Sequence, residues 1–73
     1  MERYRNSGGE SGVQSYEIGV DYIKVKFLGT SKTYIYSYKR AGSIHVEKMK
    51  SSAKNGSGLN AYINKYVKNE YDR

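Results

Sequence analysis

Residues 33–40 read TYIYSYKR, and this stretch decides the fold. Its three tyrosines, Tyr34, Tyr36 and Tyr38, occupy every second position. Because successive side chains of an extended strand point to opposite faces, the three rings line one face of a predicted β-strand. Two cations, Lys39 and Arg40, follow at once.

The ladder of tyrosines at positions 34, 36 and 38 has two interpretations. Rings that face outward would form a platform on which nucleic-acid bases stack. In that orientation the alternate residues, Thr33, Ile35 and Ser37, would have to fill the core, which they do poorly. Burial of a ring contributes a few kcal/mol, which a chain of this size needs. We therefore expect the ladder to face inward, with Tyr38, nearest the strand end, the most exposed.

Two further strands precede the ladder, at residues 13–18 and 22–27. In the second of them an apolar set alternates with a polar, basic one (Ile23, Val25 and Phe27 with Tyr22, Lys24 and Lys26). This alternation is typical of a half-buried antiparallel strand. Short turns that contain glycine separate the strands. The sequence thus predicts a three-stranded antiparallel β-meander.

A first helix is expected from Ser43, taken as its N-cap, to the loop at residues 55–58. Its apolar stripe is weak and consists of Met49, Ala53 and one of two earlier residues, Ile44 or Val46. The loop reads NGSG, which ends a helix.

The last helix has the clearest pattern in the chain. Its apolar residues follow the i, i+3, i+4, i+7, i+8 spacing (Leu59, Tyr62, Ile63, Tyr66 and Val67). Ser57 or Asn60 is expected to cap it. Three strands followed by two helices predict an α+β domain in which both helices pack on one face of the sheet.

The length of 73 residues allows one domain. Residues 1–12 are polar and rich in glycine and serine, so we expect a disordered N-terminal arm. The single βββαα domain is expected at residues 13–69, followed by a tail at residues 70–73. The absence of cysteine excludes disulfides and thiolate zinc sites, and charged residues interrupt every apolar run. These features predict a cytoplasmic protein that does not cross a membrane.

The net charge of +6 is unevenly distributed. Residues 22–68 contain one carboxylate, Glu47, and ten cations (Lys24, Lys26, Lys32, Lys39, Arg40, Lys48, Lys50, Lys54, Lys65 and Lys68). A folded region this basic favours an anionic partner and fast electrostatic encounter. A solvated lysine surface with no partner is the alternative interpretation.

The Tyr34-Ile35-Tyr36 segment, the stretch Ser52-Ala53-Lys54 with Gly56, and the final amphipathic helix together resemble the KTSC domain family. The family is named after a C-terminal extension of some lysyl-tRNA synthetases and also occurs as small stand-alone bacterial proteins. It is characterised by a central Tyr-x-Tyr pair, followed by a stretch of small residues, serine, lysine and glycine. The resemblance covers about residues 13–67 and implies the βββαα fold. RNA binding is the family's proposed role.

Few residues could carry catalysis. His45 is the single histidine, and with Glu47 on the same helix it provides too few ligands for a metal. Ser51 and Ser52 lack the partners of a catalytic triad. The NGSG loop lacks the Gly-Lys-Ser/Thr ending of a phosphate-binding loop. We therefore expect a binding protein that is not an enzyme and uses no cofactor and no metal.

Two binding functions remain open. The first is binding of RNA or another nucleic acid. The predicted interface is a basic surface with one aromatic residue (Lys24, Lys26, Tyr38, Lys39, Arg40, Lys48, Lys50 and Lys54). The second is a protein–protein interaction or structural role that uses an open sheet edge or exposed Tyr22 and Ile35.

Overall fold

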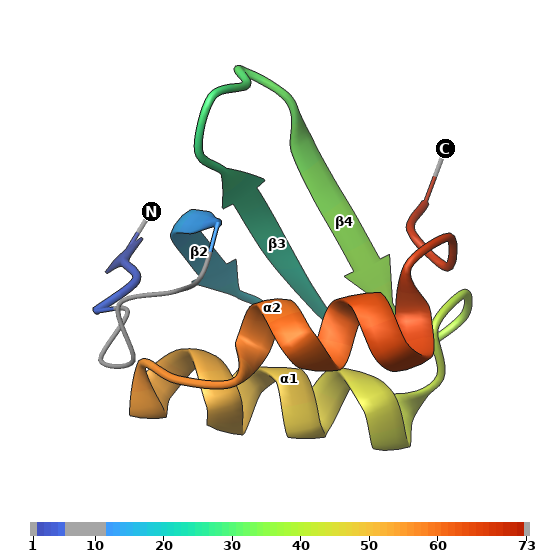
Figure 1. Ribbon diagram of the computed structural model, residues 1–73. Helices are drawn as coiled ribbons and strands as arrows, with labels where there is room; N and C mark the ends of the chain where they lie inside the picture. Colours follow the sequence, from blue (N-terminus) through green and yellow to red (C-terminus); the bar gives the residue numbers. More distant parts are fainter. Residues whose placement is uncertain (1, 6–11, 73) are drawn as a thin grey trace.

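The chain forms an α+β structure, a four-stranded antiparallel sheet with two helices on one of its faces (Figure 1). The computed structural model describes residues 2–5 and 12–72. The sheet has the order β1-β2-β3-β4. Its strands are β1 (Glu2–Arg3), β2 (Val13–Ile18), β3 (Tyr22–Phe27) and β4 (Thr33–Ser37). The helical layer consists of α1 (Ser43–Asn55), the short α2 (Leu59–Tyr62) and the π-helix η1 (Ile63–Val67), which continues α2 directly.

The tyrosine ladder faces the helices, as predicted. Antiparallel pairing sets Tyr36 opposite Ile23 and Tyr34 opposite Val25, so these residues share the inner face of the sheet. Tyr36 is 2% exposed and Tyr34 is half-buried. Tyr38 lies just beyond the end of β4 and is 36% exposed, as expected for the last ring of the ladder.

Helix α1 follows Gly42, whose φ of 98° favours glycine, and no side chain caps it. Ser43 is therefore the first helical residue and not the cap that we expected. Of the two alternatives for the apolar stripe, Val46 is buried, whereas Ile44 is 73% exposed. The helix ends at Gly56, which adopts the left-handed conformation common after a helix.

The last helix departs from the predicted pattern at one apolar position. Leu59, Ile63 and Val67 are buried at a spacing of four, whereas Tyr66 is 50% exposed. A π-helix turns through a smaller angle per residue than an α-helix. In η1, Val67, four residues after Ile63, therefore stays on the core side, whereas Tyr66, three residues after Ile63, points outward. The helix begins after Gly58, which has no side chain to cap it, so the expected local caps Ser57 and Asn60 are not used.

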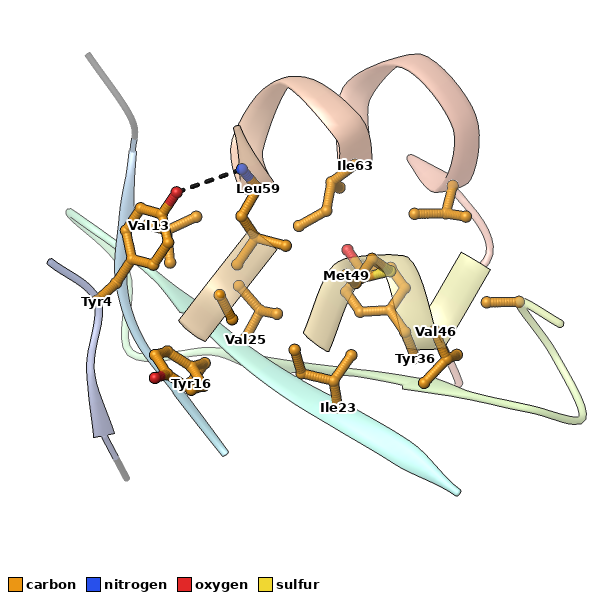
Figure 2. Packing of buried hydrophobic residues seen from close by; sticks show 13 residues of the cluster. Tyr4, Val13, Tyr16, Ile23, Val25, Tyr36, Val46, Met49, Leu59 and Ile63 are labelled. Atoms are coloured by element: carbon orange, nitrogen blue, oxygen red, sulfur yellow. Dashed lines mark hydrogen bonds between the residues drawn. The ribbon is translucent and has the colours of Figure 1, made fainter. Parts of the chain in front are cut away.

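The N-terminal residues correct our expectation of a disordered arm, within the part of it that the structure describes. Strand β1 pairs with β2, with Glu2 opposite Tyr16. Tyr4 is 4% exposed and packs edge-on against Tyr16, with ring centroids 6.5 Å apart (Figure 2). The meander therefore has a fourth strand. The remainder of the predicted arm, residues 1 and 6–11, lies outside the described residues.

The C-terminal tail also contacts the sheet. The backbone N–H of Asp72 donates a hydrogen bond to the carbonyl of Ile35, 2.6 Å away, and the Ser37 hydroxyl donates to the Asp72 carboxylate at 2.8 Å. Tyr71 packs against the cluster of buried residues. The folded unit thus extends beyond residues 13–69 at both ends.

The core lies between the sheet and the helical layer (Figure 2). Its largest fully buried side chains come from both layers (Tyr36, Ile23, Met49, Leu59, Val25, Val46 and Val67). No helix in the described ranges is long and apolar enough to cross a membrane.

Candidate nucleic-acid interface

The eight residues of the predicted interface lie in three parts of the structure. Lys24 and Lys26 point from β3 to the sheet face that the helices do not cover, because their neighbours Ile23 and Val25 are buried. Tyr38, Lys39 and Arg40 lie in the connection between β4 and α1. Lys48, Lys50 and Lys54 belong to α1. The structure does not unite all eight in one surface.

The two lysines of β3 have polar neighbours on the uncovered sheet face. The ammonium of Lys24 lies 3.7 Å from the Glu17 carboxylate and 5.7 Å from the centre of the Tyr22 ring. The ammonium of Lys26 donates to the side-chain oxygen of Gln14 at 3.3 Å. Because Glu17 offsets one of the two charges, this face attracts an anion less than the sequence alone indicates.

Tyr38 and Lys50 meet in a polar cluster around Glu47. Lys50 is 9% exposed and donates hydrogen bonds to the Glu47 carboxylate at 2.9 Å and to the carbonyl of Val20 at 3.1 Å. Its ammonium also lies 5.3 Å from the centre of the Tyr38 ring, and the Tyr38 hydroxyl donates to Glu47. Lys50 thus fastens α1 to the turn between β2 and β3. It is a structural residue and not an accessible ligand contact, which corrects our assignment.

The pKa values of this cluster follow from its hydrogen bonds. The bond to Glu47 raises the pKa of Tyr38, and the bonds from Tyr38 and Lys50 lower the pKa of Glu47. Burial disfavours the charged form of Lys50, but the hydrogen bond and the charge of Glu47 outweigh burial and raise its pKa. The charged forms of Glu47 and Lys50 therefore stabilise each other at neutral pH.

Lys54 lines a hollow of about 520 Å³ together with four residues of β1 and β2 (Glu2, Tyr16, Glu17 and Ile18). The Arg5 guanidinium donates to the carbonyls of Lys54 and Asn55 at the end of α1, at 2.8 and 3.2 Å. A cation suits this negative helix end. Acidic Glu2 among the lining residues offsets the charge of Lys54, so this hollow is a poor site for a polyanion although it is large.

A cluster of aromatic rings on the helical layer is absent from our predicted set. Nδ1 of His45 lies 2.6 Å from the Tyr62 hydroxyl, and the His45 ring stacks on Tyr66 with centroids 5.7 Å apart. The Tyr62 and Tyr66 rings lie 4.7 Å apart, and the ammonium of Lys65 lies 5.3 Å from the centre of Tyr66. Burial and the neighbouring Tyr66 raise the pKa of Tyr62. The sequence indicates this cluster only through the i, i+4 spacing of Tyr62 and Tyr66, a spacing that equally predicts core residues.

These rings adjoin cations that form no ion pair with a described carboxylate. Lys39, Arg40 and Lys48 are exposed. Lys39 and Arg40 precede the first turn of α1, and His45 in that turn contacts Tyr66. Among the described residues, ion pairs are formed by Lys24 and Lys50. We define the basic helical surface by six residues, Lys39, Arg40, His45, Lys48, Lys65 and Tyr66.

A second feature missed from the sequence is a groove between the β3–β4 hairpin, η1 and the C-terminal tail. It has a volume of about 350 Å³ and nine lining residues (Phe27, Thr30, Tyr34, Tyr36, Ile63, Asn64, Lys68, Asn69 and Tyr71). We call it the aromatic groove. Its rings meet edge to face, with centroids 4.8 Å apart for Tyr34 and Tyr71. Tyr71 gave no signal, because it lies in the stretch that we had assigned to a tail.

No group of three or more histidine, cysteine, aspartate or glutamate side chains suited to a metal is found within residues 2–5 and 12–72. Comparison with protein-family models, with curated proteins and with solved structures finds no match to this chain. The resemblance to the KTSC family therefore stays a prediction based on the residues quoted above.

Proposed function

We propose that the protein is a small module that binds single-stranded nucleic acid, with RNA as the preferred ligand. The basic helical surface is the observation that supports this function best. It consists of two exposed cations in the connection that leads into α1, one on α1 and one on η1, and the last of these lies over a tyrosine ring that is 50% exposed. Unneutralised cations supply affinity for phosphates, and exposed rings supply stacking for unpaired bases.

The uncovered sheet face supports the proposal less well. Its two lysines contact Glu17 and Gln14, and it has one aromatic residue, Tyr22. The hydroxyl of Tyr22 donates to Glu17 at 3.3 Å, so this ring is held over the sheet. We therefore move the proposed interface from β3 to the helical layer and retain Lys39, Arg40 and Lys48 from the original set.

The test is binding of a fluorescent oligouridylate, measured by anisotropy over a series of salt concentrations. We expect affinity to fall steeply with salt, because each phosphate contact with a single strand contributes roughly 0.7 to the slope of log K against log salt. The triple variant Lys39→Glu, Arg40→Glu, Lys48→Glu should abolish binding. A matched reversal on the sheet face, Lys24→Glu with Lys26→Glu, should weaken it much less.

Two results would contradict the proposed function: binding by the native protein that does not change with salt, and no binding to any polynucleotide. A larger loss of affinity from the sheet-face reversal than from the helical one would retain the function and return the interface to β3.

The alternative role, protein interaction through an open sheet edge, has weaker support. The tail covers the middle of the β4 edge, where Asp72 pairs with Ile35. The opposite edge is β1, which has two residues and offers little length for pairing. A partner whose capture survives nuclease treatment, or self-association that increases with concentration, would favour this role over nucleic-acid binding.

A further inference from the structure

We infer that the aromatic groove receives one unstacked base of the strand that the basic helical surface holds. The inference rests on the proposed function and adds to it a site and a ligand group. The groove lies between β4, η1 and the tail, and η1 is also the element that carries Lys65 and Tyr66. A strand that crosses η1 thus passes from the basic helical surface to the groove.

The groove is lined by aromatic rings that the fold buries only in part. Phe27, Tyr34 and Tyr71 are each half-buried although they pack against the core cluster. They meet edge to face, with interplanar angles of 65° for Phe27 with Tyr34 and 70° for Tyr34 with Tyr71. A planar heterocycle stacks on the face of a partly exposed aromatic ring, and every base has such a planar face.

The floor of the groove is apolar and rigidly placed. Tyr36 and Ile63 are each 2% exposed, and the ring centroids of Tyr36 and Tyr71 lie 6.3 Å apart. Tyr36 is fixed by its place in β4, and Ile63 by its place in the core side of η1. Such a floor needs no large rearrangement to accept a ligand.

The rim of the groove supplies polar groups of the required kind. Asn64 is exposed on η1, and its carboxamide has both donors and an acceptor, like the edge of a base. Lys68 is exposed at the same rim and offers an ammonium to a phosphate. No carboxylate lines the groove among the described residues, in contrast to the larger hollow beside Lys54.

The size of the groove limits what it accepts. Pockets for small molecules have volumes of about 300–1,000 Å³, and the groove, at about 350 Å³, lies at the lower end. A single planar group fits this volume, whereas a duplex does not. Unpaired bases are the groups that proteins extract from single-stranded RNA and stack on aromatic side chains.

The experiment compares a short oligouridylate with an abasic oligonucleotide of equal length and charge. If the groove holds a base, the native protein should bind the oligouridylate about tenfold more tightly, as one stacked base provides. Tyr71→Leu, which retains apolar bulk without a flat ring, and Asn64→Ala should each reduce this preference severalfold. Neither variant should change affinity for the abasic strand. Asn60→Ala, one helical turn before Asn64, is the matched control and should leave the preference intact.

The outcomes separate the inference from the proposed function. Equal, salt-dependent binding of both oligonucleotides by the native protein overturns the groove inference and base stacking on Tyr66, and leaves phosphate binding by the basic helical surface standing. Binding of neither overturns both. A base preference that survives in both Tyr71→Leu and Asn64→Ala also overturns the inference, because the base then stacks elsewhere. If Tyr71→Leu fails to fold, Asn64→Ala, an exposed position, still decides the question.

Discussion

The Tyr4 hydroxyl accepts a hydrogen bond from the backbone N–H of Leu59, 3.2 Å away, and so joins the N-terminal segment to the first residue of α2 (Figure 2). The residue before the helix, Gly58, has no side chain with which to cap it. The first N–H groups of a helix have no partner within the helix, and a buried one costs free energy when it is unpaired. Tyr4 therefore serves as the cap of a helix that lies 55 residues further along the chain.

Tyr4→Phe should lower the free energy of unfolding by about 1–3 kcal/mol, because it removes the bond and leaves the N–H of Leu59 buried. Tyr4→Ala should cost about 3–5 kcal/mol, since it also opens a cavity beside Tyr16. Urea unfolding followed by circular dichroism measures both. Arg3→Ala, at an exposed neighbouring position, is the control and should be nearly neutral. Unchanged stability of Tyr4→Ala would mean that residues 2–5 form no part of the folded unit.

Lys50 and Lys48 lie two residues apart on α1 but have opposite roles. Lys50→Met should lower stability by about 1–3 kcal/mol, because the carbonyl of Val20 and the carboxylate of Glu47 lose a charged donor. Lys48→Met should leave stability within about 0.5 kcal/mol, as is usual at an exposed position.

The same two variants should change RNA affinity in the opposite order. Lys48→Met removes a cation of the basic helical surface and should weaken binding, whereas Lys50→Met should not, because its charge is already matched by Glu47. Thermal unfolding and anisotropy on the same samples make the comparison. Weaker binding by a fully folded Lys50→Met would return Lys50 to the interface.

Much of the fold is predictable from the sequence because local patterns agree with tertiary burial. The residue ranges 13–18 and 22–27 are strands with the predicted bounds, since alternation is a local property of a half-buried strand. The inward orientation of the ladder followed from the need of a small domain to bury its rings. Helix α1 ends at the predicted loop, where Gly56 adopts a positive φ.

The remainder depends on contacts between residues distant in sequence. Strand β1 has two residues and no apolar alternation, so its pairing with β2 leaves no local signal. The tail contact of Tyr71 with Tyr34 is likewise invisible before the chain folds. Tyr66 was misplaced because a helical pattern assumes α geometry, and η1 is a π-helix. The aromatic groove combines the β3–β4 hairpin, η1 and the tail, so no single stretch predicts it.

Gly19 is required by the ring of Tyr22, which lies across it. A Cβ at position 19 would lie 2.1 Å from that ring, closer than any real contact allows. Gly19→Ala should therefore rotate Tyr22 away from Glu17 and Lys24 and cost about 1–3 kcal/mol in stability. At Gly12 a Cβ would meet no atom of the described residues within 4 Å, so Gly12→Ala is the matched control.

A double-mutant cycle distinguishes this clash from a general effect of alanine in the turn. If the ring of Tyr22 is the cause, Gly19→Ala should cost almost nothing in a Tyr22→Ala background. The same cost in both backgrounds would show that the backbone, and not the ring, requires glycine at this position. Denaturant unfolding of the four proteins provides the cycle.

The stability of the protein should depend on pH in the alkaline range through Tyr36. Burial, with smaller contributions from Tyr34 and Tyr71, raises the pKa of Tyr36 from 10.0 to about 12. Between these values the folded protein retains a proton that the unfolded chain has released, so the free energy of unfolding falls as pH rises. The stabilising contribution is complete below pH 10 and is lost as pH approaches 12, by roughly 2–3 kcal/mol in total.

Tyr36→Phe removes this titration and retains the buried ring. Its urea midpoint should therefore fall less between pH 10 and pH 12 than that of the native protein, whatever its stability at neutral pH. Parallel curves for the native protein and Tyr36→Phe would contradict the placement of the Tyr36 hydroxyl in the core.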